Sequence, residues 1–489
     1  MPHIYSGDTV AAQAMGKSKT STKPPSGTRD FLPDDLLRRR TVIGVIQRIY
    51  ESHGFVPVET PAIENLSTLL GKYGEEGDQL LYRLLHRRDA LRRPLEQAQA
   101  EGRVAEESEL ADQGLRYDLT VPLARVVAQY GQLPRFFKRY QIQPVWRADR
   151  PGRGRFREFY QCDVDITGTT SLVAEAEVCA AVSKVLVELG FEDFAIKLNH
   201  RELLRAMIRA AGVDEADEGT ALVAVDKLDK IGEQGVLEEL GERGIAAEAG
   251  RSLLELVRRP ELDAESADSA ESTESTRADL NEATLEGLAA RVDARGQAAI
   301  DGLRELLRLS AATPAGSHLE VDPALARGLG YYTGPIFEIA VADLAGSLGG
   351  GGRYDDLVGM FGKRQVPAVG FSLGLERILV VMEERGMFPS LSTGPDLMLC
   401  WMDVDQAEVM RVATTLRATG LKVEVYPEAS KKLGKQLQYA DAEGVQARFA
   451  AILGKDELIT NAITLKHLAS GRQQTLPLGE VSPIRLESV

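Results

Sequence analysis

The clearest alternation of apolar and polar positions lies in residues 138–165, where two alternating runs flank a short segment rich in glycine, proline and arginine. Alternation at every second position predicts two strands, and Pro151, Gly152 and Gly154 supply the turn between them. Side chains alternate along a strand, so the second run places one set of residues on a single face. The set comprises Arg155, Arg157, Phe159, Gln161, Asp163 and Asp165. A face of guanidinium, amide and carboxylate groups indicates a binding surface rather than a buried strand.

The chain is expected to form several domains, because 489 residues are more than a single hydrophobic core usually supports. Residues 36–52 have apolar positions at helical spacing and lead into an extended run. Residues 86–113 are charged and predict surface helices, and residues 201–310 are mostly helical in pattern. After a Gly-Pro linker, residues 396–489 alternate strand and helix, which predicts an α/β domain with a mainly parallel sheet.

Composition excludes several classes of protein. An apolar content of 44% and a charged content of 27% are typical of a soluble globular protein. The three cysteines and six histidines lack the spacing of a disulfide framework or a metal site, so we expect a reducing cytoplasm and no metal held by protein groups alone. No apolar run approaches the ~20 residues that span a bilayer. Residues 1–25 are polar and lack the apolar core of a signal peptide, which predicts a disordered tail.

The net charge of −15 is unevenly distributed. Residues 211–300 contain 22 acidic and 9 basic residues, and the acidic, serine-rich part at residues 261–284 predicts a loosely ordered loop. Between Arg135 and Arg157, by contrast, seven arginines and one lysine accompany a single acid, Asp149. Phosphate is the natural ligand of such a hairpin. A solvated charged hairpin is the alternative that composition leaves open.

Several motifs resemble one family. VWRAD (residues 145–149), followed by FREFYQCDVD (residues 156–165), is similar to motif 2 of class II aminoacyl-tRNA synthetases in its histidyl-tRNA synthetase form. The similarity extends over about residues 26–489, apart from residues 86–113 and much of 201–320. The other motifs that carry it are RYDLT (116–120), ARGLGYYTG (326–334), GGGGRYD (349–355) and PAVGFSLGLERI (367–378). The glycines of GGGGRYD predict a turn. In the last motif the resemblance implies a strand that contains Gly370 and Gly374, followed by a helix from about Leu375 that presents Arg377.

This resemblance implies an architecture. It comprises an α+β catalytic domain with an antiparallel sheet flanked by helices, over residues 26–200 and 320–390. A mostly helical insertion domain would span residues 201–319, and an α/β anticodon-binding domain residues 395–489. The family's motif 1, matched by the helix and extended run that begin at residue 36, implies a homodimer.

The resemblance also implies an activity. Histidine and ATP, the latter with Mg²⁺ on its phosphates, would form histidyl-adenylate, and the histidyl group would pass to the 3′ end of tRNA(His). Arg147 would hold the α-phosphate and Arg327 would stabilise the developing charge, as the two catalytic arginines. The remaining ATP contacts would be Asp149, Arg155, Gly370, Gly374 and Arg377, with both glycines admitting the adenine.

Histidine itself would bind in a polar pocket. Asp118 would receive the α-ammonium with help from Thr120, which the strand period places on the same face. A structural ion pair of Asp118 with Arg116 or Arg125 is the alternative that the residues leave open. Asp165 and Tyr332 would contact the two ring nitrogens. Gln161, Arg327 and Tyr331 complete the implied histidine site.

Two further residue groups have a structural and a functional interpretation. His200 precedes a helix pattern and predicts a helix cap rather than a ligand. Lys431, Lys432 and Lys435 begin a helix on the expected RNA side, although a charged surface helix is an equal alternative.

Two alternative functions compete with the ligase. A catalytically inactive regulatory paralogue of ATP phosphoribosyltransferase is disfavoured by residues 396–489 and by the intact Arg147, Arg327 and Arg377. A synthetase for another amino acid is disfavoured by RGLGYYTG and by Asp165.

Overall fold

The computed structural model describes residues 21–260, 270–326, 330–344, 346–389, 392–430 and 432–486. The chain divides into two compact units. The first unit contains Thr41–Met387, and the second contains Phe31–Arg40 with Phe388–Val489. Among the described helices, none combines the length and the apolar character that crossing a membrane requires.

The first unit is built on an eight-stranded sheet with the order β1-β5-β6-β11-β10-β9-β7-β8. The central strands pair antiparallel, and the β1–β5 and β7–β8 pairs at the two edges are parallel. The bounds are β1 Val56–Pro57, β5 Phe137–Trp146, β6 Glu158–Thr167, β7 Phe194–His200, β8 Leu319–Val321, β9 Pro335–Val341, β10 Gly349–Arg353 and β11 Ala368–Gly374. The predicted antiparallel sheet flanked by helices is therefore confirmed.

One face of this sheet is apolar and the other is polar, as the alternation of β6 predicts. Cys162 and Val164 are fully buried on the apolar face, against helix α7 (Val173–Glu188). Helix α1 (Pro33–Ser52) contributes Tyr50, whose hydroxyl donates to the Cys162 carbonyl at 3.4 Å. The candidate functional residues lie on the polar face.

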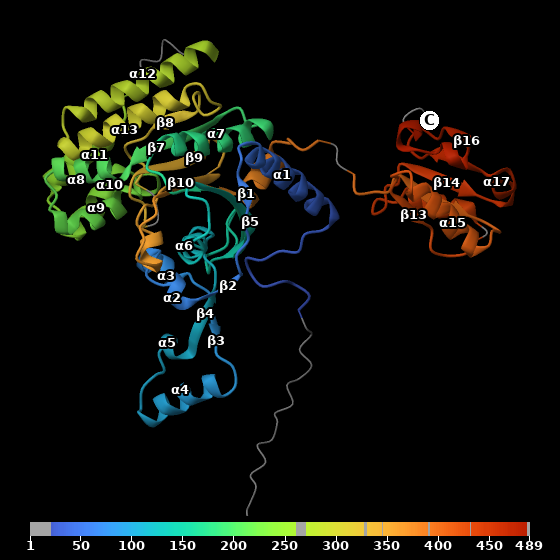
Figure 1. The fold of residues 1–489 in the computed structure, drawn as a ribbon, viewed down its shortest axis with the longest axis horizontal. Helices are drawn as coiled ribbons and strands as arrows, with labels where there is room; N and C mark the ends of the chain where they lie inside the picture. Colours follow the sequence, from blue (N-terminus) through green and yellow to red (C-terminus); the bar gives the residue numbers. More distant parts are fainter. Residues whose placement is uncertain are drawn as a thin grey trace, which may run out of the picture. The chain divides into compact units, whose positions relative to one another are not determined.

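A group of helices lies beyond β7 and β8 at one end of the sheet (Figure 1). They are α8 Arg201–Ala210, α9 Glu218–Val225, α10 Leu228–Glu242, α11 Ala247–Val257, α12 Ala270–Ala289 and α13 Ala294–Ser310. The expectation of a loose loop over residues 261–284 is wrong from residue 270 onward, because that part belongs to α12. Leu285 and Leu288 of α12 are buried, so packing stabilises this acidic helix. Residues 261–269, like residues 1–20 of the expected tail, lie outside the described part.

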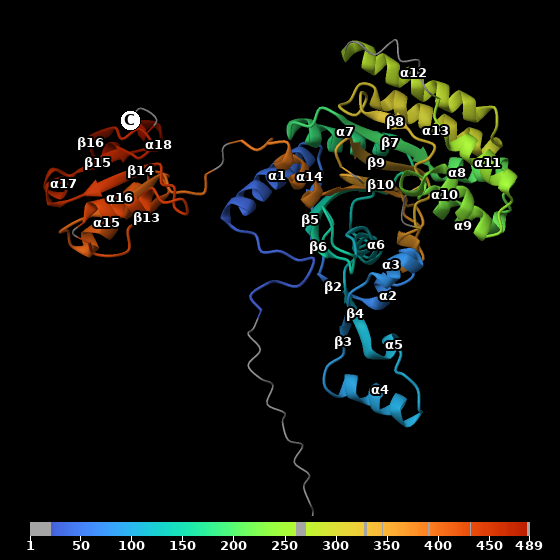
Figure 2. The ribbon, with the colours of Figure 1, turned by 180° about the vertical axis from the view of Figure 1, so that it is seen from behind.

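A small sheet with the order β2-β4-β3 projects from the first unit together with two short helices (Figure 2). Its strands are β2 Ile63–Asn65, β3 Arg83–Leu85 and β4 Ala111–Leu115, and the helices are α4 Asp89–Ala100 and α5 Glu107–Leu110. The predicted surface helices of residues 86–113 are thus present, except that the last three residues join β4. Helices α2 Leu66–Leu69, α3 Gly74–Gln79 and α6 Thr120–Gln129 complete this region.

The second unit contains a five-stranded sheet with the order β13-β12-β14-β15-β16. Its elements are β12 Leu397–Trp401, α15 Gln406–Arg417, β13 Val423–Val425, α16 Leu433–Ala440, β14 Phe449–Leu453, α17 Lys455–Thr460, β15 Ala462–His467, β16 Gln473–Pro477 and α18 Pro483–Leu486. The predicted strand–helix alternation is correct, but only β13, β12 and β14 are parallel. The connections from β14 to β16 are too short for the crossovers that parallel strands require.

The glycine-rich segment that begins at Gly349 is a strand, β10, and not the turn that its composition suggests. A Cβ at Gly351 would lie 2.1 Å from the Gly370 carbonyl oxygen, and one at Gly349 would lie 2.4 Å from that of Ser372. These glycines therefore allow β10 to approach β11 closely.

Candidate active site

Two rows of paired residues cross the polar face of the sheet from β5 to β10. The first row is Arg139, Asp165, Gly370 and Gly352, and the second is Gln141, Asp163, Ser372 and Gly350. Polar side chains on β5 and β6 thus lie beside three glycines and Ser372 on β11 and β10. The glycines leave room above the sheet, and the side chains of neighbouring segments occupy part of it.

Asp165 is held by two groups. The Tyr354 hydroxyl donates a short hydrogen bond to Asp165 Oδ1, and Arg139 Nη2 lies 2.9 Å from Asp165 Oδ2. The same nitrogen is 3.8 Å from Asp163 Oδ2, and Arg139, Asp163 and Asp165 are all buried. Burial raises the pKa of both aspartates, the negative charge of Asp165 raises the pKa of Asp163 further, and Arg139 opposes both shifts.

Gly370 and Gly352 lie beneath Asp165 and Tyr332, respectively. A Cβ built on Gly370 would meet Asp165 Oδ1 at 1.9 Å, and one on Gly352 would meet Tyr332 Cδ1 at 2.9 Å. Because the two glycines are direct partners across β10 and β11, the structure brings the side chains of Asp165 and Tyr332 to one place. The space over Gly370 is taken by this carboxylate, which differs from the expected opening for adenine.

Asp118 forms a second buried carboxylate site. Its Oδ1 accepts hydrogen bonds from the Tyr73 hydroxyl and the Val121 backbone N–H, both at 3.1 Å, and its Oδ2 accepts from the Tyr331 hydroxyl at 3.3 Å. Burial raises the pKa of Asp118, and these hydrogen bonds together with the charge of Arg147 oppose the shift. Asp118 thus resembles the Asp163–Asp165 pair in being buried with its charge only partly compensated.

The alternative ion pair of Asp118 with Arg116 or Arg125 is wrong. Arg125 Nη2 lies 2.6 Å from Glu64 Oε1, and Arg116 Nη1 donates to the Thr60 carbonyl at 2.6 Å. Both arginines are therefore engaged elsewhere.

The expected strand over RYDLT is also wrong. β4 ends at Leu115 and α6 begins at Thr120, so Asp118 and Thr120 do not share a strand face. Asp118 instead accepts from a backbone N–H in the first turn of α6, a position where helices favour negative charge. Thr120 nevertheless lies at the site, because a hydrogen bond with Thr120 opposes the rise in the pKa of Tyr331 that burial causes.

Several buried polar atoms on this face make no hydrogen bond within the described part of the chain. They are Arg139 Nε and Nη1, Gln141 Oε1, Gln161 Oε1, Asp163 Oδ1 and Asp165 Oδ2, the last of which has only its ion pair with Arg139 Nη2. Gln161 uses only its amide nitrogen, which donates to Ser372 Oγ at 2.8 Å. Buried polar groups normally have partners, so a set of such atoms on one face of the sheet indicates a polar ligand. Four of the six atoms are oxygens, which suits a ligand rich in N–H donors.

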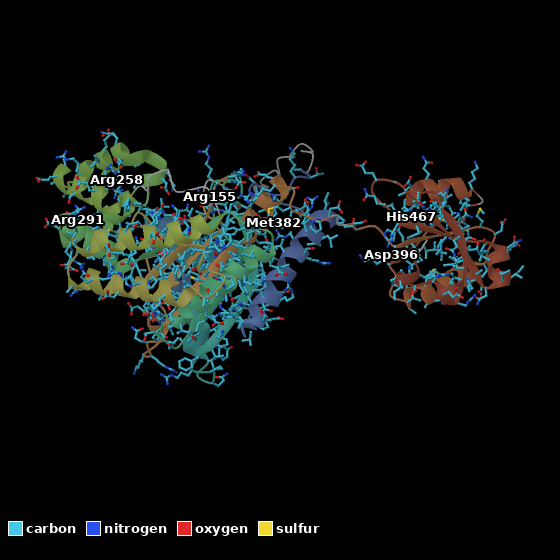
Figure 3. The ribbon with its side chains drawn as sticks, turned by 90° about the horizontal axis from the view of Figure 1, so that it is seen from above. Arg155, Arg258, Arg291, Met382, Asp396 and His467 are labelled. Carbon is cyan, nitrogen blue, oxygen red and sulfur yellow. The ribbon has the colours of Figure 1, made fainter. Side chains whose placement is uncertain are left out.

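The basic hairpin loop lies between β5 and β6. Arg147 Nε donates to the Tyr117 carbonyl at 3.1 Å, and the guanidinium lies 4.2 Å from the Tyr117 ring centroid. Arg155 Nη2 donates to Asp149 Oδ1 at 2.7 Å, although 54% of the Arg155 side chain is exposed. Figure 3 labels Arg155 in the first unit. Arg155 and Arg157 precede β6, so the prediction that they share its face is wrong. The alternating strand begins only at Glu158, and the preceding turn has no such period.

Arg377 reaches the same loop from the next element. It lies in the first turn of α14 (Leu375–Glu384), directly after β11, as predicted. Its Nε donates to the Gly154 carbonyl at 3.3 Å and its Nη1 to the Ser347 carbonyl at 2.5 Å. Gly374 ends β11, where a Cβ would lie 3.3 Å from the Leu348 carbonyl oxygen. Arg327, the other expected catalytic arginine, lies outside the described residues.

Three residues of the pocket were missed by sequence reasoning. Tyr354 follows the glycines of GGGGRYD, and Arg139 shares the alternation of β5, so a signal existed for both. Tyr73 lies between α2 and α3 and has no motif that distinguishes it. Only the fold brings its hydroxyl to Asp118.

Two of the expected RNA-contacting lysines lie at the start of α16. Lys432 directly precedes this helix, and the exposed Lys435 Nζ lies 3.4 Å from Glu428 Oε2. Lys431 is outside the described residues. These contacts leave the charged-helix alternative open.

Two family models match the chain. The model described as histidyl-tRNA synthetase matches residues 103–378, and the model described as anticodon binding domain matches residues 398–485. The histidine–tRNA ligase of Cytophaga hutchinsonii is 41% identical over 465 residues, which cover 94% of this chain and 98% of the relative. That of Gloeobacter violaceus is 40% identical over 495 residues, with the same two coverages.

Solved structures give a similar result. The histidyl-tRNA synthetase of Nostoc sp. PCC 7120 superposes with a TM-score of 0.72 at 30% identity, over 96% of this chain and 99% of the other. A Bacillus halodurans C protein titled ATP phosphoribosyltransferase regulatory subunit/histidyl-tRNA synthetase superposes at 0.64, over 84% of this chain and 94% of the other. At 21% identity this second likeness shows the fold alone.

Proposed function

The chain belongs to the histidyl-tRNA synthetase family, and we propose that it joins histidine to tRNA through histidyl-adenylate, with histidine in the acidic pocket and ATP at the basic loop. The activity is that of an aminoacyl-tRNA ligase. The regulatory paralogue is less supported, because the histidine–tRNA ligases match 94% of the chain, including the second unit.

The observation that carries this proposal is the charge of the buried pocket. Asp118, Asp163 and Asp165 are buried, and Arg139 is the fully buried cation that pairs with two of them. A ligand that brings positive charge and N–H donors would offset the cost of burying these carboxylates. Histidine has both, in its α-ammonium and its imidazole.

Each pocket residue then has a proposed role. Asp118 receives the ammonium with Thr120 beside it, and Asp165 and Tyr332 contact the two ring nitrogens. Gln161 orients the substrate through its unsatisfied Oε1, and Tyr331 supports Asp118. Arg327 would contact the carboxylate of the substrate. Tyr354 and Arg139 hold Asp165 and are additions to this set.

ATP is proposed to bind over the loop between β5 and β6. Arg147 holds the α-phosphate, and Arg155 and Arg377 hold the outer phosphates and the base, with Asp149 fixing Arg155. Gly374 lies where β11 meets α14, and Gly370 acts mainly through Asp165. This placement is supported by the hydrogen bonds that Arg155 and Arg377 donate to residues of the loop. Mg²⁺ would bridge the phosphates and neutralise part of their charge.

The chemistry needs positioning and charge compensation more than acid–base catalysis. A carboxylate oxygen of histidine attacks the α-phosphorus, and the bond to the bridging oxygen of the β-phosphate breaks as diphosphate leaves. Both reactants are anionic, so Arg147 and Arg327 would stabilise the transition state. In the second step a terminal ribose hydroxyl of tRNA attacks the acyl carbon and AMP leaves.

The proposal extends to partners and location. The anticodon-binding domain suits a tRNA partner, and Lys431, Lys432 and Lys435 are proposed to contact its backbone. A homodimer built through α1 and the strand that follows, and a cytoplasmic location, complete the proposal.

ATP–diphosphate exchange across the twenty amino acids tests it directly. Histidine is expected to support exchange, and tRNA charging should follow with histidine alone. The Asp165→Ala variant should lose affinity for histidine, because it removes the carboxylate that is proposed to contact the imidazole. Polar sites of this kind discriminate against apolar isosteres of their substrate by factors of ~10⁴. Asp405→Ala, which removes a helix cap in the second unit, is the control. Exchange with a different amino acid, or unchanged histidine affinity in Asp165→Ala, would defeat the assignment.

A further inference from the structure

The two tyrosines of the pocket lie between β8 and β9, in the tyrosine segment (residues 323–334), of which the structure describes residues 323–326 and 330–334. Tyr331 donates to Asp118 Oδ2, and Tyr332 lies over Gly352. The shape of the pocket therefore depends on where this segment is fixed. Both of its ends are bonded to the last residues of β7 and the first residue of α8.

The first end is held by Asn199, which is fully buried. Its Nδ2 donates to the carbonyls of Pro323 and Leu325, both at 3.1 Å, and its Oδ1 accepts from the His200 backbone N–H at 2.8 Å. Both amide protons and the acceptor oxygen are thus used. An asparagine in β7 therefore fixes residues 323–325, which precede the two tyrosines in the chain.

The second end is held by the next residues along the chain. The Arg201 backbone N–H donates to the Gly334 carbonyl at 2.9 Å, and Asn199 and His200 pair with Ile336 and Pro335 of β9. Three consecutive residues, Asn199 to Arg201, therefore clamp both ends of the tyrosine segment. The sequence pattern singles out His200 in this stretch as a helix cap, but the proposed reaction gives none of the three residues a role.

We infer that Asn199 is a positioning residue for the amino-acid pocket, acting through the segment that carries Tyr331 and Tyr332 rather than by touching the substrate. This inference rests on the proposed function of the pocket. Asparagine suits the position because its amide supplies two donors and one acceptor at this length. Alanine would leave two buried carbonyls without a donor, and aspartate would supply no N–H.

The chain contains a matched control. Asn281 of α12 is also buried, its Nδ2 donates to the Leu319 carbonyl at 3.0 Å, and its Oδ1 accepts from the Val321 N–H at 2.8 Å. These bonds hold β8, which ends before the tyrosine segment. Asn281→Ala therefore removes the same chemistry from the same kind of environment without releasing the tyrosines.

The experiment compares Asn199→Ala with Asn281→Ala in full-length protein. It measures KM for histidine and for ATP in diphosphate exchange, L-histidine affinity by calorimetry without ATP, and the urea midpoint. Asn199→Ala should weaken histidine binding about tenfold or more and leave KM for ATP within about twofold. Asn281→Ala should lower the urea midpoint to a similar extent and leave both KM values unchanged.

Equal histidine affinities in the two variants would overturn the inference, as would parallel losses for histidine and ATP in Asn199→Ala. If Asn199→Ala does not fold, Asn199→Ser, which retains one donor, should give an intermediate loss of histidine affinity, and wild-type affinity in that variant would also overturn it. Wild-type protein that fails to exchange with histidine would instead defeat the proposed function.

Discussion

Asp165 occupies the space that any side chain at Gly370 would need, since a Cβ at position 370 would come within 1.9 Å of Asp165 Oδ1. The Asp165 carboxylate of β6 lies over its partner on β11, in the volume that a side chain at position 370 would fill. It can lie there only because position 370 is glycine. This relation makes position 370 part of the proposed amino-acid pocket, although no atom of glycine carries chemistry there.

Gly370→Ala is therefore expected to raise KM for histidine by about a hundredfold. The new methyl group must displace Asp165, and overpacking of this kind costs about 1–3 kcal/mol in addition to the lost contact. Diphosphate exchange at varied histidine concentration measures the effect. Gly302→Ala in α13, where no atom lies within 4 Å of the added Cβ, is the control and should leave KM unchanged. A normal KM in Gly370→Ala would show that Asp165 does not contact the substrate.

Tyr354→Phe tests the hydrogen bond that fixes Asp165. Hydrogen bonds to charged groups are worth about 1.5–3 kcal/mol, so KM for histidine should rise about ten- to a hundredfold while KM for ATP changes little. Tyr140→Phe is the matched control, because Tyr140 donates to Glu51 at 2.7 Å and alternates away from Arg139 on β5. Similar histidine KM values in the two variants would contradict the role of Tyr354.

Arg139→Met should reduce the free energy of unfolding by about 3–5 kcal/mol at pH 8, because it leaves two buried carboxylates without their counterion. Their folded-state pKa values, already raised by burial, should rise further. A carboxyl group with a raised folded pKa stabilises the fold at low pH and loses that contribution as pH rises through the folded value.

The loss in Arg139→Met should therefore be smaller at pH 5.5 than at pH 8. Urea unfolding at both pH values measures it. Arg153→Met removes an exposed ion pair with Glu384 and should change the free energy of unfolding little at either pH, because solvent screens such pairs. An equal loss at both pH values in Arg139→Met would argue against titration of the aspartate pair.

His200, the middle residue of the Asn199–Arg201 stretch, makes the free energy of unfolding depend on pH. Its Nδ1 accepts from the Glu202 backbone N–H at 3.1 Å as the cap of α8, and burial lowers its pKa to about 4 against an opposing effect of Glu202. A lowered folded pKa stabilises the fold above the unfolded value near 6.5, and this contribution is lost as pH falls toward 4. Protonation also removes the acceptor of the cap.

His200→Asn keeps a capping acceptor that does not titrate. Relative to this variant, the wild type should lose roughly 2 kcal/mol of unfolding free energy between pH 7 and pH 4.5. Urea unfolding across this range provides the measurement. Parallel stability curves for the two proteins would mean that His200 is not held neutral by the fold.

The elements with strong local signals were predicted from the chain alone. The alternation around the basic loop predicted β5 and β6, and the motif that includes Gly374 predicted a strand followed by a helix at Leu375, which the structure confirms. His200 was correctly predicted to cap a helix. In each case the period or the cap lies within a few residues, so the backbone preference is local.

The errors occurred where a local preference competed with packing. Asp118 and Thr120 were placed on a strand, but the chain turns into α6 between them. The glycines from Gly349 onward indicated a turn, but their missing side chains serve the close approach of β11. In a sequence, a glycine can indicate either a turn or a place where two strands approach closely. Only the position of the neighbouring strand distinguishes these two cases.

The sequence by itself determined the alternating polar face of β6, the concentration of arginines in the loop before it, and the family that these motifs indicate. Only the tertiary structure decided which groups meet: Tyr354 with Asp165, Tyr73 with Asp118, and Asn199 with the tyrosine segment. These partners are separated by 189, 45 and 124 residues along the chain. The period of a strand fixes the face of each side chain, whereas its partner across the pocket follows from strand order and close packing, which no local pattern encodes.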